Sequence, residues 1–207
     1  MPNLAETVVN QLVFNPTNCF KQDNYPHFIK YMGSKSKIMD FVTDGVNEVY
    51  NGGAVCDLFA GSGSLLGALG RQVPMVSNDI QAYSGTIADV YLNGWLESGV
   101  PSVEEIVGAA EKIVRQRAAK YPIAYDYFQG IDRESFVAIE KTHQSFIDIS
   151  FDNDWHLFTK NYSGTWWSAE QCAWIDALRE VAEQYKHTQS FNLILSCLMH
   201  SLMVHWP

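Results

Sequence analysis

Apolar side chains recur along the chain with two kinds of spacing, one typical of helices and the other of buried strands. Helical spacing predicts amphipathic helices over residues 4–13, 38–49 and 81–97. Short apolar runs at 54–59 and 73–77 predict buried strands, with a glycine turn and a short helix between them. Residues 54–79 therefore predict strand, turn, helix and strand, which is the first βαβ unit of a doubly wound α/β fold.

The second half of the chain is mainly helical in its pattern. Ser102 and Ser168 are each followed three residues later by Glu or Gln, so each predicts a capping box that opens a helix. A further helix is predicted over about 132–145, and loops or short strands over the aromatic stretch 150–166. A last, very apolar segment covers 191–204.

No clear strand follows residue 77, so the pattern predicts an α/β, Rossmann-like fold whose sheet is incomplete, with a helical insertion after the second strand. We expect three parts. They are a cofactor-binding α/β portion at 1–100, a mainly helical insertion at 101–190, and an apolar helix at 191–207. Left uncovered, that last helix should present an exposed apolar patch.

Composition narrows the class of protein. The chain of 207 residues is 47% hydrophobic and carries a net charge of −9. It shows no apolar run of the roughly 20 residues that a membrane helix needs, and no secretory signal, so we expect a cytoplasmic protein. Four widely spaced cysteines predict buried, reduced thiols. The histidines lack metal-ligand spacing, so no metal site is expected.

The acidic charge argues against general attraction to nucleic acid, because phosphate contacts need Lys and Arg. A local basic face remains open, formed by Arg115, Arg117, Lys120 and Arg133; an ordinary solvated helix face is the alternative. Trp166 and Trp167 leave a similar choice. They could stack on a base, or form an aromatic corner before the helix at Ser168.

The candidate chemistry lies at Asp57–Ser64 (DLFAGSGS) and at Asp79, sixteen residues after Gly63. Glycines allow a sharp turn and close approach of a ligand, and an acid at the end of the second strand can accept hydrogen bonds from ribose hydroxyls. A tight turn without a ligand, and a solvated acid, are the alternatives. The third glycine, Gly67, comes one residue late for a dinucleotide fingerprint. An acid at Asp57 suits the ammonium and sulfonium of S-adenosylmethionine better than a pyrophosphate.

Five stretches of the sequence carry a family resemblance. Asp57–Ser64 resembles motif I of S-adenosylmethionine-dependent DNA methyltransferases, and Lys30–Ile38 (KYMGSKSKI) resembles motif X of the adenine-specific type, which precedes motif I. Ser77–Ile80 (SNDI) resembles motif II. The stretches 164–171 (GTWWSAEQ) and 175–179 (IDALR) resemble a segment that these enzymes carry before their catalytic motif.

The resemblance implies S-adenosylmethionine as cofactor, double-stranded DNA as partner and the N6 amine of adenine as methyl acceptor. Tyr31 and Lys35 would line the cofactor pocket, and Asp79 would hold the ribose. The turn at Gly61 and Gly63 would pass under the methionine part of the cofactor. Three further residues of these motifs join them as candidate cofactor-binding residues: Asp57, Phe59 and Ile80.

One departure from the family pattern matters most. The family's catalytic Asp/Asn-Pro-Pro-Tyr/Phe motif accepts hydrogen bonds from the amine of a flipped adenine. The sequence contains no Pro-Pro pair, so no catalytic residue is assigned. We expect an N-terminal portion that works with a complementing C-terminal chain. The alternatives are a non-catalytic binding fragment and another nucleotide-binding α/β enzyme such as an oxidoreductase.

Overall fold

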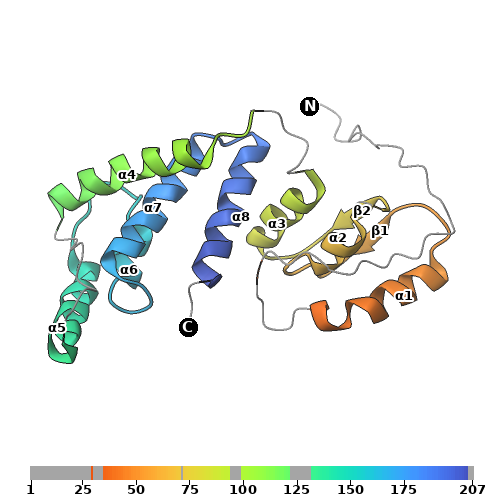
Figure 1. The fold of residues 1–207 in the computed structure, drawn as a ribbon, viewed down its shortest axis with the longest axis horizontal. Coiled ribbons are helices and arrows are strands. Elements are labelled where there is room, and N and C mark those ends of the chain that lie inside the picture. The colour runs from red at the N-terminus through yellow and green to blue at the C-terminus, as the bar shows by residue number, and fades with distance from the viewer. Residues whose placement is uncertain (1–28, 30–34, 71, 94–98, 122–131, 205–207) are drawn as a thin grey trace. The chain divides into compact units, whose positions relative to one another are not determined.

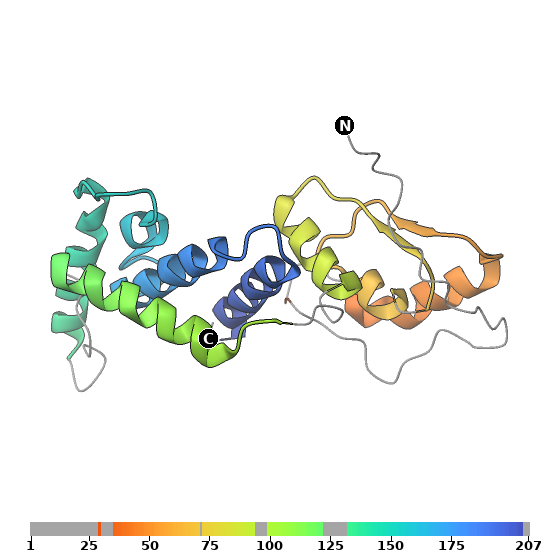
Figure 2. The ribbon, with the colours of Figure 1, turned by 90° about the horizontal axis from the view of Figure 1, so that it is seen from above.

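The computed structural model describes residue 29 and residues 35–70, 72–93, 99–121 and 132–204. The chain divides into two units (Figures 1 and 2). The strand unit comprises Met1–Glu97 and Met199–Pro207, and the helical unit comprises Ser98–Leu198. The predicted helix at 4–13 lies outside the described residues.

The strand unit alternates helices and strands in the predicted order. Its elements are η1 (Lys35–Ile38), α1 (Met39–Val49), β1 (Val55–Asp57), α2 (Ser64–Leu69), β2 (Met75–Ser77) and α3 (Ala82–Asn93). The two strands are parallel, and Val55 pairs with Met75 and Asp57 with Ser77. Among the described residues they form a sheet of two strands, so the βαβ unit is confirmed, whereas a complete Rossmann-like sheet stays a prediction.

One face of the two strands is covered by helices. Met39 of α1 and Leu69 of α2 are fully buried together with Val73, and Val55 and Met75 of the strands pack against them. Burial of these aliphatic side chains is the main force that holds such short strands in place, because two strands alone are marginally stable.

The opposite face of the strands is bare. Cys56 and Val76 are partners in the register, and both are exposed, Val76 by 51%. Parallel sheets are normally covered on both faces, so this face is incomplete among the residues described. The prediction that all cysteines are buried was wrong for Cys56 and Cys197, whereas Cys172 is buried.

The helical unit contains α4 (Val103–Lys120), α5 (Arg133–Gln144), η2 (Ser145–Asp148), α6 (Leu157–Tyr162) and α7 (Ala169–Glu183). α8 (Gln189–Val204) crosses the division between the units. Both predicted capping boxes are present: Ser102 and Ser168 accept from the backbone N–H groups of Glu105 and Gln171. No helix among the described residues is long and apolar enough to cross a membrane.

α4 and α7 pack against each other (Figure 1). Ala110 of α4 and Ala173 and Ala177 of α7 are fully buried at this contact, and Phe146 of η2 closes the core. Alanines at the crossing let the two backbones approach, so that the larger Val114 and Phe146 fill the space that remains.

Two expectations were wrong. Residues 157–162 form helix α6, where loops or short strands were expected. The sequence pattern gave no sign of this helix because the acid that caps it, Asp176, lies far along the chain in α7. The apolar segment 191–204 forms α8, yet Met203 is the large apolar side chain of α8 that is exposed, and Ile194 is buried. Exposed large apolar side chains occur in both units, and those next to the glycine turn and the strand ends are Leu58, Phe59, Val76 and Ile80.

Candidate functional site

The glycine turn after β1 is fixed on both sides by hydrogen bonds. Gly61 and Gly63 both adopt the left-handed conformation, with φ of 53° and 72°. The N–H of Gly61 donates to Asp79 Oδ2 at 2.9 Å, and the Gly61 carbonyl accepts from Ser84 Oγ at 2.7 Å. The end of β2 and the start of α3 therefore determine the path of this turn.

The two glycines of the turn have different roles. A Cβ on Gly63 would lie 2.9 Å from the ring of Tyr91, which is buried, so Gly63 allows α2 to pack on α3. Among the residues that the structure describes, no heavy atom lies within 4 Å of a Cβ placed on Gly61. The space above Gly61 is open, so a ligand can approach its backbone closely.

Asp79 joins the turn to the end of β2. Its Oδ1 accepts from the N–H of Gln81 at 2.9 Å, while its Oδ2 accepts from Gly61. The backbone N–H of Gln81, and then that of Gly61, hold the pKa of the Asp79 carboxyl below its usual value. The carboxylate is therefore charged at neutral pH. Each oxygen also keeps a lone pair that can accept a hydrogen bond from a ligand hydroxyl.

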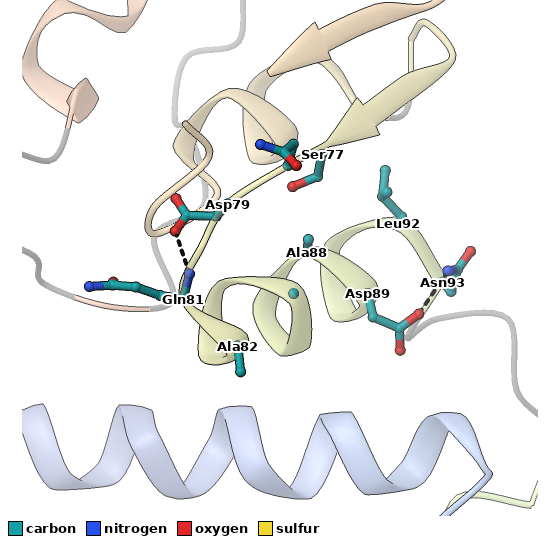
Figure 3. Close-up of a pocket in the computed structure, with 10 residues that line it drawn as sticks. Ser77, Asp79, Gln81, Ala82, Ala88, Asp89, Leu92 and Asn93 are labelled. Carbon is teal, nitrogen blue, oxygen red and sulfur yellow. Dashed lines mark hydrogen bonds between the residues drawn. The ribbon is translucent and has the colours of Figure 1, made fainter. Parts of the chain in front are cut away.

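A pocket of about 390 Å³ opens between the end of β2 and one face of α3 (Figure 3). This volume lies in the range of small-molecule sites, roughly 300–1,000 Å³. Small side chains at Ala82, Gly85 and Ala88 hollow the helix face, and the lining residue Asp79 also holds the glycine turn through Gly61. The lining consists of Ser77, Asn78, Asp79, Gln81, Ala82, Gly85, Ala88, Asp89, Leu92 and Asn93.

The remaining residues proposed for cofactor binding are placed unequally. Asp57 ends β1, its carbonyl accepts from the Asn78 N–H at 2.8 Å, and its carboxylate accepts weakly from the Phe59 N–H at 3.3 Å. Phe59 is 79% exposed and Ile80 is fully exposed. The structure thus brings Asp57 and Asp79 to the same edge of the sheet and leaves two apolar side chains open nearby.

Two of the predicted residues are not placed. Tyr31 lies outside the described residues, as does most of the segment that resembles motif X. The backbone of Lys35 opens η1, but its side chain is not among those described.

Sequence reasoning missed Ser84 and Tyr91, which hold the turn from α3. Helical spacing was the available signal, because Ser84, Ile87 and Tyr91 recur at intervals of three and four and all three are buried.

The basic face proposed for the second half is largely neutralised in the helical unit. Arg117 is buried and pairs with Glu180 at 2.5 Å, Lys120 pairs with Asp152 at 2.7 Å, and Arg115 pairs with Glu111 on its own helix. Arg133 begins α5. These pairs offset the positive charge of the three proposed residues on α4.

The described residues contain no group of three or more His, Cys, Asp or Glu side chains that could hold a metal ion.

In a comparison with protein families, residues 31–194 match the family described as D12 class N6 adenine-specific DNA methyltransferase. Searches of curated proteins and of solved structures returned no match.

Proposed function

Since the chain belongs to the D12 class of N6 adenine-specific DNA methyltransferases, we propose that its strand unit binds S-adenosylmethionine for methyl transfer to adenine in DNA. The main support for this proposal is the double role of Asp79, which holds the glycine turn through Gly61 and also lines the pocket beside β2. A nucleoside held by a strand-end acid and a methionine part held over a glycine turn need this juxtaposition.

The residues present fit this cofactor. The remaining acceptor positions of Asp79 suit ribose hydroxyls, and the open space at Gly61 admits the methionine part. The carboxylate of Asp57 supplies negative charge near the ammonium and sulfonium groups. Phe59 and Ile80, exposed on either side, offer apolar contacts to the adenine ring. The family membership favours this activity over the oxidoreductase alternative.

The test is calorimetric titration of the 207-residue chain with S-adenosylhomocysteine, the demethylated product. Gly61→Val should abolish binding, since a branched side chain fills the open space above the turn. Gly53→Val is the matched control, because Gly53 also has positive φ (96°) and open space, but precedes β1. Equal affinity in both variants, or tighter binding of NADH than of S-adenosylhomocysteine, would overturn the assignment.

Methyl transfer itself needs acceptors for the adenine amine, and the 207 residues contain no Pro-Pro pair from which the family's motif could be built. We propose that a further polypeptide carrying Asp-Pro-Pro-Tyr supplies these acceptors. The bare face at Cys56 and Val76 supports the proposal, because the two strands need further structure to be covered on both sides.

The second proposal is tested by tritiated methyl transfer to unmethylated DNA. The 207-residue chain alone should incorporate no label, and addition of a chain with the Asp-Pro-Pro-Tyr half should restore incorporation. A variant of that second chain with Ala-Pro-Pro-Ala in place of the motif is the control. Robust incorporation by the 207-residue chain alone would place the catalytic acceptors within it and refute this proposal.

A further inference from the structure

The turn between α6 and α7 carries two neighbouring tryptophans, Trp166 and Trp167, which differ in how far they are exposed to solvent. Trp167 is half-buried, with its ring centroid 5.6 Å from that of Phe158 and 6.1 Å from that of Tyr162. Trp166 is 57% exposed, and Tyr162 beside it is 38% exposed. The two tryptophans therefore differ in exposure: Trp167 packs against Phe158 and Tyr162, and Trp166 is the more exposed of the two.

The backbone that carries Trp166 is braced from several directions. The N–H groups of Thr165 and Trp166 donate to the Tyr162 carbonyl, and the N–H of Gly164 donates to the Trp167 carbonyl at 2.8 Å. Gly164 has a φ of 68°, and a Cβ there would collide with the carbonyl of Glu140. This position therefore requires glycine.

The neighbouring helices complete the brace. Gln144, at the end of α5, donates from Nε2 to the Gly164 carbonyl at 2.7 Å. Ser168 begins α7 directly after the turn with a reciprocal capping box. An exposed side chain on a backbone that is already fixed loses less conformational entropy when it binds than one on a flexible loop.

The charge near this turn differs from that of α4. Lys160 lies in the last turn of α6, two residues before Tyr162, and forms no ion pair in the part of the chain that the structure describes. Arg117 and Lys120, in contrast, are occupied by carboxylates. Lys160 is thus available for a phosphate in the helix that leads into this turn.

We propose that Trp166 stacks on a base of the DNA substrate and that Lys160 contacts a neighbouring phosphate. The inference rests on the proposed function, since it takes DNA as the substrate of this family. An exposed aromatic face together with a basic side chain is the combination that contacts bases and backbone together. Because the chain as a whole is acidic, the contact should depend on these few side chains rather than on general attraction.

The test is fluorescence anisotropy of a labelled, adenine-containing duplex titrated with the 207-residue chain. Trp166→Ala should weaken binding by about 5- to 150-fold, the range found for loss of one base–aromatic stack. Trp166→Phe should retain most of the affinity, because a phenyl ring still stacks. Ile147→Ala, which removes a 55% exposed apolar side chain elsewhere in the helical unit, is the matched control and should bind as wild type.

Lys160 is tested by salt dependence. Lys160→Gln should lower the slope of log affinity against log salt by about 1, the loss of one phosphate contact. Lys141→Gln on α5 is the control, with an unchanged slope. Circular dichroism of each variant confirms that the fold is retained.

Binding of Trp166→Ala within twofold of wild type, or absence of DNA binding by the wild-type chain, would overturn the proposal. Neither result would affect binding of S-adenosylhomocysteine to the strand unit, which decides the proposed function separately.

Discussion

Replacing Asp176 by alanine should destabilise the helical unit, because this carboxylate caps α6 from another helix. Asp176 is 4% exposed. It accepts from the N–H of Phe158 at 3.0 Å, and from both the N–H and the hydroxyl of Thr159 at 2.8 Å. His156, at the N-cap position, provides no side-chain hydrogen bond of its own. Asp176 therefore satisfies the backbone donors that the start of α6 would otherwise leave open.

The magnitude follows from what each donor loses. Thr159 is fully buried, so its N–H and hydroxyl would lose their acceptor without access to water, at roughly 1–3 kcal/mol for each unsatisfied buried group. The N–H of Phe158 is nearer the surface and can be hydrated. Burial raises the pKa of Asp176, so removing the carboxylate also recovers part of its desolvation cost. The net loss in free energy of unfolding for Asp176→Ala is about 2–4 kcal/mol.

Urea unfolding followed by tryptophan fluorescence measures this loss, since four of the six tryptophans (155, 166, 167 and 174) belong to the helical unit. Asp176→Asn keeps one acceptor oxygen and should lose about half as much. Asp148→Ala is the control. Asp148 is exposed, so its removal should change the free energy by no more than about 0.5 kcal/mol. A change for Asp176→Ala as small as that of the control would refute the capping role.

Two further predictions concern the glycine turn and pH. Gly63→Ala should lower the free energy of unfolding by about 2–4 kcal/mol, because the new side chain adds left-handed strain and a clash with Tyr91. Gly61→Ala should lower it by only about 1–2 kcal/mol, because it adds the strain alone. Equal melting temperatures for the two variants would contradict this prediction. Burial lowers the pKa of both His143 and His156 below the usual 6.5. Just below pH 6.5 the unfolded chain therefore binds more protons than the folded protein, and the free energy of unfolding should fall as the pH drops through about 6.5. Urea titrations at pH 7.5 and 5.5 measure the slope, and a free energy that rises on acidification would show the sign to be wrong.

Elements with local signals could be predicted from the sequence, and those that depend on remote partners could not. The capping boxes at Ser102 and Ser168 lie within four residues of sequence, and both were confirmed. Helix α6 was missed because its cap is Asp176, 17 and 18 residues away from the donors that it satisfies. Aromatic composition at 150–166 predicted loops or short strands, but remote hydrogen bonds favour a helix at 157–162.

The candidate site shows the same division. The sequence placed Asp79 at the end of the second strand, and in the structure its carboxylate also accepts a hydrogen bond from the N–H of Gly61. Spacing could not show that Gly63 serves packing while Gly61 faces open space, because that difference depends on Tyr91 in α3. The roles of these residues in binding a cofactor stay predictions.

The remote cap of α6 also has a consequence for the order in which the chain acquires structure during synthesis. Six residues are too few to form a stable helix alone, since helix nucleation is unfavourable and α6 has no local cap. Residues 157–162 leave the ribosome well before Asp176 does. We therefore expect α6 to remain unformed on the nascent chain until α7 has emerged and folded, so that the turn carrying Trp166 is among the last parts of the helical unit to be completed.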